Sequence, residues 1–142
     1  MSDSFKANAT ARAKKSRMKL KKLTTLLVVD EIEPHLPTWQ KLGYEVTVRV
    51  PDEGPLGFAI LAGPAGELML QTQRSLADDL PAVAKKRPSH LLYGDVASLA
   101  KASSALAHAR VLVPRRKTFY GADEIWFELA DGNILGLAEH SG

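Results

Sequence analysis

Two residues suited to ligand binding alternate near the C-terminus of the chain. Trp126 and Glu128 are separated by one residue, and alternate residues of a strand share a face, so both lie on one side of the strand predicted there. An indole beside a carboxylate suits an apolar ligand, including one that carries a cation. The alternative is that Trp126 is half-buried packing and Glu128 is a solvated strand residue.

A third candidate, His90, opens an earlier apolar strand on the same predicted face. It could hydrogen-bond a ligand or act as a base near neutral pH, although a single histidine is more often structural. His35, His108 and His140 fall on predicted helices or at the end of the chain, where we expect no catalytic role. We find no Gly-rich phosphate loop and no Ser-His-Asp arrangement in the sequence.

The composition describes an ordinary globular chain. Its 142 residues are 45% hydrophobic and 25% charged, enough for one domain with its own core. The absence of cysteine excludes disulfides, a thiol nucleophile and a zinc–thiolate site. No apolar run reaches the roughly 18 residues of a membrane span, and no secretory apolar region follows the N-terminus, so we expect a cytoplasmic protein.

The net charge of +3 is unevenly distributed. Residues 1–22 hold eight of the 19 basic side chains and one of the 16 acidic ones, so this segment carries +7 and the remainder −4. The segment has few large apolar groups, and we expect a basic mobile tail. A solubilising extension explains it best. Nucleic acid binding is the minority alternative, because lysines without interleaved aromatics supply only salt-sensitive attraction to phosphate.

An internal repeat organises the rest of the chain. Leu26–Asp30 and Leu91–Asp95 are apolar strands ending in aspartate, 65 residues apart, and at the same offset Val46–Val48 matches Val111–Val113. Helix-length segments, 31–42 and 96–107, lie between these strands. Asp30 and Asp95 stand where helix N-caps belong.

Further elements complete two copies of a β-α-β-β-β order. A helix near 75–87 is predicted to join the copies, and Trp39 on the first helix is expected to pack on the outer face of the sheet. Each copy ends in two more predicted strands, at 56–62 and 67–71 in the first and at 125–129 and 133–138 in the second.

The segment Tyr120–Leu135 resembles the closing motif of the vicinal oxygen chelate superfamily, which includes glyoxalases, bleomycin-resistance proteins and extradiol dioxygenases. The motif pairs an aromatic residue with glycine, then a strand, Asp-Pro-Asp-Gly-Asn and a last strand; Ala130 replaces the proline here. Leu26–Asp30 with the following helix resembles the family's first motif, and Glu67–Gln71 its fourth strand. The resemblance implies an α+β fold in which two βαβββ modules form a curved mixed sheet, a cup with helices on the outside.

By this resemblance, residues 23–142 form one domain, with modules at about 23–73 and 88–139. The family's metal ligands would fall on Leu23, with Thr24 as the alternative, on Met69 and on Gly136. The fourth would fall near Pro88, or on His90 after a two-residue slip. At most one of these positions offers a ligand, whereas a catalytic site needs about three. We therefore expect no metal and no cofactor, as in a metal-free branch resembling bleomycin-resistance proteins.

The resemblance and strand alternation together give a predicted ligand-binding set. The cup face is expected to carry Glu67, Met69, Gln71, Ile134, Gly136 and Ala138, and Arg115–Lys117 is expected to be a solvated loop. The predicted ligand-binding residues are Met69, Gln71, His90, Tyr120, Trp126 and Glu128.

These observations favour a metal-independent protein that binds a small apolar or aromatic molecule in the cup, as a homodimer. One alternative is a lyase, isomerase or dioxygenase that uses a metal through non-standard ligands or acid–base chemistry by His90 and Glu128. Another is a regulatory or nucleic-acid-associated module that acts through its tail.

Overall fold

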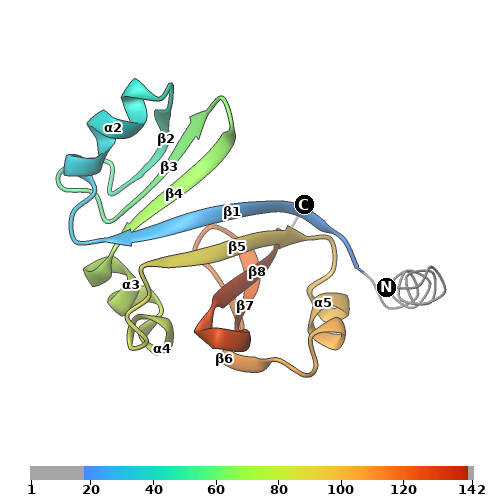
Figure 1. The fold of residues 1–142 in the computed structure, drawn as a ribbon. Coiled ribbons are helices and arrows are strands. Elements are labelled where there is room, and N and C mark those ends of the chain that lie inside the picture. Colours follow the sequence, from blue (N-terminus) through green and yellow to red (C-terminus); the bar gives the residue numbers. More distant parts are fainter. Residues whose placement is uncertain (1–17, 141–142) are drawn as a thin grey trace.

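A computed structural model of the chain, which describes residues 18–140, contains two βαβββ modules in one curved, unclosed sheet (Figure 1). The first module comprises β1 (Leu20–Val29), η1 (Glu33–His35), α2 (Leu36–Lys41), β2 (Glu45–Val50), β3 (Phe58–Gly63) and β4 (Gly66–Thr72). The second comprises β5 (His90–Val96), α5 (Leu99–Ala105), β6 (Arg110–Lys117), β7 (Ala122–Glu128), η2 (Ala130–Gly132) and β8 (Ile134–His140). The expected α+β fold and module order are confirmed.

The strand register supports the internal repeat. The sheet order is β2-β3-β4-β1-β5-β8-β7-β6, with β1 and β5 antiparallel at the centre. In each module the first strand runs parallel to the last, and all other neighbours are antiparallel. Leu26 pairs with Met69 and Tyr93 pairs with Gly136, a separation of 43 residues in both modules.

Three apolar clusters hold the sheet. On the outer face, α2 packs over Leu61 and Leu70, and α5 packs over Phe127 and Leu137; Trp39 joins the first of these clusters, as expected. Alternate residues of the same strands face the concave side, as the period of two requires.

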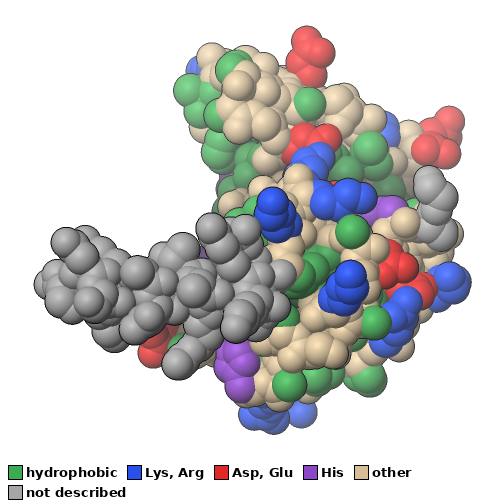
Figure 2. All heavy atoms as spheres, turned by 90° about the vertical axis from the view of Figure 1, so that its right-hand side faces the viewer, with side chains coloured by type: hydrophobic (Ala, Val, Ile, Leu, Met, Phe, Trp, Pro, Cys, Tyr) green, Lys and Arg blue, Asp and Glu red, His purple; other side chains and the backbone are tan. Residues whose placement is uncertain are grey.

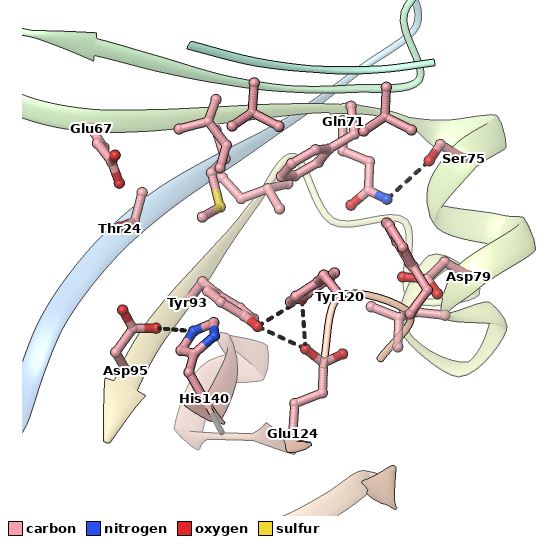
Figure 3. Close-up of a pocket in the computed structure, with 18 of the residues that line it drawn as sticks. Thr24, Glu67, Gln71, Ser75, Asp79, Tyr93, Asp95, Tyr120, Glu124 and His140 are labelled. Carbon is pink, nitrogen blue, oxygen red and sulfur yellow. Dashed lines mark hydrogen bonds and ion pairs between the residues drawn. The ribbon is translucent and has the colours of Figure 1, made fainter. Parts of the chain in front are cut away.

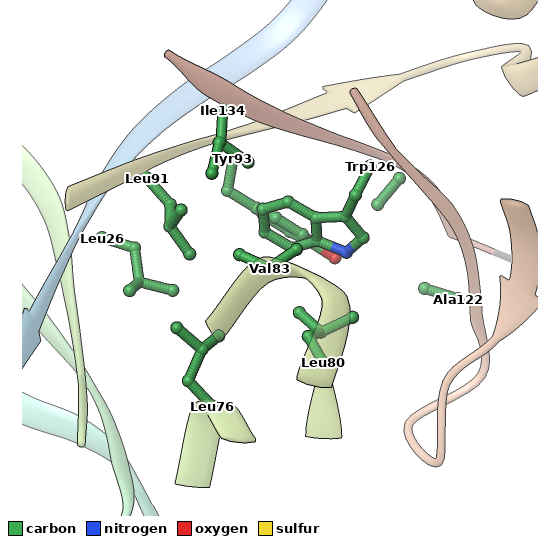
Figure 4. Close-up of a cluster of buried hydrophobic side chains, with 10 residues drawn as sticks. Leu26, Leu76, Leu80, Val83, Leu91, Tyr93, Ala122, Trp126 and Ile134 are labelled. Atoms are coloured by element: carbon green, nitrogen blue, oxygen red, sulfur yellow. The ribbon is translucent and has the colours of Figure 1, made fainter. Parts of the chain in front are cut away.

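The third cluster lies on the concave face and differs from the expectation that helices stay outside. The segment joining the modules forms α3 (Gln73–Asp79) and α4 (Pro81–Ala84). Leu76, Leu80 and Val83 of this segment pack against Tyr93 and Trp126 of the sheet (Figure 4). The helical linker therefore covers part of the concave face.

The boundary between tail and domain lies earlier than predicted. Strand β1 begins at Leu20, so Lys21 and Lys22 belong to the sheet, and Met18 packs against the cluster beneath α5. The remainder of the predicted tail, residues 1–17, lies outside the described residues. On the face shown in Figure 2, basic and acidic side chains are interspersed. None of the helices within residues 18–140 is long and apolar enough to cross a membrane.

The helix N-caps also differ from the prediction. Asp95 lies inside β5, and the Ser98 side chain accepts a hydrogen bond from Lys101 N at 3.2 Å to cap α5. In the first module, Asp30 lies before η1 and does not cap a helix. Pro34 and Pro37 limit this helical segment to η1 and the six-residue α2. Glu139 adds a second acceptor at the start of α5, receiving Leu99 N at 2.7 Å.

We predict that Ser98→Ala lowers the free energy of unfolding by about 1 kcal/mol, the usual cost of losing an N-cap. Ser104→Ala makes the same chemical change on the exposed side of α5, where alanine favours the helix. Urea denaturation of both variants checks this, with Ser104→Ala equal to or more stable than the parent. Equal stability of the two variants would contradict the assignment of Ser98.

Candidate functional site

A cavity of about 520 Å³ lies between the concave surfaces of the two modules (Figure 3). The first module supplies its apolar wall, with side chains from Val48, Val50, Phe58, Ile60 and Met69. The second module and the linker supply the opposite wall, with Leu80, Tyr93, Phe119, Tyr120 and Trp126. Strand alternation explains the first set and, in the second, Tyr93 and Trp126, whereas Leu80 comes from the linker and Phe119 and Tyr120 from the turn before β7.

Trp126 belongs to the core and to the cavity wall. Its side chain is 2% exposed and packs on Tyr93 with ring centroids 5.7 Å apart. Its indole also lies across Gly136 of β8: a Cβ added to Gly136 would stand 2.7 Å from three ring carbons. The space above Gly136 is therefore filled by the indole, and no longer side chain fits at that position.

Glu124 is the buried polar centre of this wall. It is 1% exposed, and Trp126 Nε1 donates to its Oε1 at 2.9 Å. Arg116 donates to the same oxygen from Nε at 3.0 Å and from Nη2 at 2.6 Å. The other carboxylate oxygen accepts the hydroxyls of Tyr93 at 2.8 Å and Tyr120 at 3.3 Å. All these partners are donors, so the carboxylate is satisfied only as an acceptor.

The same environment holds the two tyrosines in their neutral form. Burial, followed by the adjacent Glu124 carboxylate, raises the pKa of Tyr93 far above its ordinary value. Burial and Glu124 also raise the pKa of Tyr120 to about 12. Their hydroxyl oxygens lie 3.0 Å apart beside the cavity.

Arg116 connects this centre to the linker. Its Nη1 and Nη2 donate to the two carboxylate oxygens of Asp79, at 3.0 and 3.1 Å, while Nη2 also reaches Glu124. Arg116 therefore ties the end of α3 to β7. The segment Arg115–Lys117, expected as a solvated loop, is instead the end of β6, and all three of its side chains form ion pairs.

The opposite end of the cavity is also polar. Lys22 of β1 forms an ion pair with Glu67 of β4. Asp95 of β5 accepts from, or pairs with, His140 Nε2 at 3.2 Å. Thr24 lies between these pairs and is 3% exposed.

Four of the six predicted ligand-binding residues line the cavity: Met69, Gln71, Tyr120 and Trp126. They come from β4, from β7 and from the turn before β7. That these four bind a ligand stays a prediction.

The other two, His90 and Glu128, are not among the residues that line it. Leu91 and Tyr93 face the concave side, so His90 points to the outer face, where it is exposed and hydrogen-bonds Ser89 at 3.3 Å. A one-residue error in face assignment accounts for this miss. Glu128 shares a face with Trp126, but it lies beside the linker and pairs with Lys86 at 3.4 Å and Arg110 at 3.6 Å.

The same parity settles which predicted metal positions face the cavity. Leu23 points outward and is 54% exposed, so the alternative, Thr24, is the cavity residue. Met69 lines the cavity, and Gly136 lies under the indole of Trp126. Within residues 18–140, no group of three His, Asp or Glu side chains could hold a metal ion. A metal-free protein stays a prediction.

Sequence reasoning missed Glu124, Arg116 and His140. Glu124 is two residues before Trp126, so the alternation used for Trp126 also places it on the concave face. Arg116 was not predicted as a strand residue, because β6 extends four residues beyond the predicted strand. His140 ends β8, on the face of Gly136 and Ala138, but the predicted strand stopped at Ala138.

No family model matches the sequence, and neither does any curated protein. Solved structures do match. A glyoxalase/bleomycin resistance protein/dioxygenase superfamily member from Vibrio splendidus 12B01 aligns with a TM-score of 0.61 at 17% identity, covering 85% of this chain and 99% of that one. A hypothetical protein from Bacillus halodurans C-125 gives 0.63 at 16% identity, covering 89% and 96%.

The 2,3-dioxygenase LapB from Pseudomonas sp. KL28 aligns with a TM-score of 0.56 at 12% identity. That alignment covers 87% of this chain but 43% of the dioxygenase, so this chain spans less than half of that enzyme. The likeness to these structures shows the fold, and the expected glyoxalase-like fold is confirmed.

We predict that Gly136→Ala destabilises the protein by about 1–3 kcal/mol, because the new methyl group overlaps the Trp126 ring. In a Trp126→Phe background the same substitution should cost markedly less, since the smaller ring leaves room. A double-mutant cycle by chemical denaturation measures this coupling. An unchanged cost in the Phe background would show that the indole does not occupy that space.

We also predict that Glu124→Gln destabilises the protein by about 3–5 kcal/mol, because it leaves the Arg116 charge without its buried partner and turns an amide N–H toward other donors. Asp123→Asn removes a neighbouring carboxylate that pairs with Arg115 and Lys117 at the surface, and it should change stability little. Thermal and urea unfolding of both variants provide the measurement. Similar losses in the two variants would show that Glu124 is not the buried centre.

Proposed function

We propose that this chain is a metal-independent binding protein that holds a small apolar or aromatic molecule in the cavity between its modules. The observation that carries this proposal is the packing of Trp126 over Gly136. An aromatic surface fills the place where the resemblance puts a metal ligand, and the other wall is lined by Phe58, Ile60 and Met69.

The size and lining of the cavity support a ligand of drug-like dimensions. Ligand pockets typically measure about 300–1,000 Å³ and are lined by apolar and aromatic side chains with a few fixed polar groups. The cavity of about 520 Å³ fits this description. Its rim is apolar as well, since Phe119 is 86% exposed and Val48 is 42% exposed beside the opening.

The acid–base alternative loses its basis. It depended on His90 and Glu128, which lie on opposite faces and in separate ion-pair or hydrogen-bond environments. The homodimer expected from the resemblance stays a prediction, as does the function of the tail.

Binding of N-phenyl-1-naphthylamine, a neutral fluorophore that brightens in apolar surroundings, tests the proposal. The purified chain should bind it saturably at micromolar concentration, with the same affinity before and after dialysis against a chelator. Ile60→Trp places an indole inside the cavity and should weaken binding about tenfold or more, equivalent to about 1.4 kcal/mol.

Val111→Trp is the matched control, because Val111 is exposed on the edge strand β6 and does not line the cavity. It should leave the dissociation constant unchanged. If Ile60→Trp unfolds, Val48→Trp at the cavity rim serves in its place. Binding that requires a metal ion, or that survives a filled cavity, would refute the proposal.

A further inference from the structure

Two buried polar side chains point into the cavity and have hydrogen-bonding atoms that no group in the described part of the chain occupies. Gln71 is 7% exposed, and its Nε2 donates to Ser75 Oγ at 3.1 Å, so its carbonyl oxygen remains as an acceptor (Figure 3). Thr24 is 3% exposed, and its hydroxyl has no hydrogen bond to the described residues. Neither atom is sealed from solvent, since every sealed side-chain N or O among residues 18–140 has a partner. Both atoms therefore face the cavity.

The tyrosines add acceptors, not donors. The hydroxyl hydrogens of Tyr93 and Tyr120 are used within the group around Glu124: Tyr93 is 2.8 Å from Oε2, and Tyr120 is 3.3 Å from Oε2 and 3.0 Å from the Tyr93 hydroxyl. A hydroxyl oxygen that donates its hydrogen can still accept. These hydroxyl oxygens lie toward His140, since the rings of Tyr120 and His140 are 6.4 Å apart, so acceptors are present near Asp95 as well as at Gln71.

The charges on the cavity wall are predominantly negative. Its carboxylates are Glu67, Asp79, Asp95 and Glu124, and the permanent cations that pair with them are Lys22 and Arg116. With His140 neutral, the wall carries two more negative than positive charges.

Asp95 is the cavity carboxylate that lacks a permanently charged partner. Lys22 is bound to Glu67, and Arg116 is shared by Asp79 and Glu124. The partner of Asp95 is His140, which carries a charge only when protonated. In the β1–β5 register Asp95 stands opposite Lys22, whose ammonium group is paired with Glu67, and it lies diagonally across from Thr24.

The polar ends are separated along β4. Glu67, Met69 and Gln71 line the cavity in succession, and four residues of strand span about 13 Å. Met69 lies between Glu67 and Gln71 on the same face of β4. The cavity wall thus has an acceptor at Gln71, the apolar Met69 in the middle of β4, and the Asp95 carboxylate near the Glu67 end.

We propose that the ligand is an elongated organic amine, with its ammonium group at Asp95 and Thr24 and its apolar body running past Met69 toward Gln71. This inference rests on the proposed function and specifies its ligand class. Organic anions of the same shape should bind more weakly, because they would bring a further negative charge against the carboxylates of the wall.

Three probes of one shape test the charge preference: 4-phenylbutylamine, 4-phenylbutan-1-ol and 4-phenylbutyrate. Each is titrated against the chain with bound N-phenyl-1-naphthylamine, and its dissociation constant is obtained by displacement. The amine should bind at least about tenfold more tightly than the carboxylate, with the alcohol between them, a difference of about 1.4 kcal/mol or more.

Asp95→Asn should remove the advantage of the amine over the alcohol and leave the alcohol unchanged. Asp123→Asn is the matched control, since it makes the same charge change on a carboxylate that does not line the cavity, and it should preserve the advantage. Thr24→Val keeps the shape of Thr24 without its hydroxyl and should weaken the amine more than the alcohol. If Asp95→Asn or Thr24→Val fails to fold, the other variant still tests the position of the ammonium group.

The outcomes separate this inference from the function on which it depends. If the alcohol displaces the fluorophore as well as the amine does, the amine assignment is wrong while the binding function stands. An advantage that persists in Asp95→Asn also overturns the assignment. If the fluorophore itself does not bind in the cavity, the proposed function fails, and the inference fails with it.

Discussion

The buried carboxylate of Glu124 is the interaction on which the concave face depends. An ionised group with 1% exposure is stable only when donors surround it, and here the guanidinium of Arg116, one indole N–H and two phenols do so. These donors fix the orientations of Tyr93 and Trp126. Arg116 in turn holds the linker through Asp79. One carboxylate therefore positions the cavity wall and the helices that close one side of it.

More of the fold than of the candidate site could be predicted from the sequence. Alternation and the 65-residue repeat identified both modules, because period-two patterns are local and a duplication leaves two copies to compare. The concave faces of β4 and β7 were predicted correctly, since Met69 and Trp126 both line the cavity, and Gly136 of β8 pairs with Trp126 on the same face. His90 was misplaced because a short apolar run, Leu91–Tyr93, shows no alternation and so does not reveal which side faces inward.

What sequence reasoning could not supply are contacts between distant segments. Arg116 and Asp79 are 37 residues apart, and nothing local predicts that they meet. His140 and Asp95 are 45 residues apart, brought together because β5 and β8 are neighbours in the sheet. The position of the linker on the concave face has the same origin: its apolar residues indicate that it packs, but not on which side.

The linker has a consequence for symmetry. The two duplicated modules are related across the β1–β5 pair. By themselves they would form a concave surface with two equivalent halves. A chain has only one linker, and α3 with α4 fills part of that surface with Leu76, Leu80 and Val83. The equivalence is broken by this insertion. A duplicated architecture thereby acquires a concave cavity whose two walls differ in shape and chemistry.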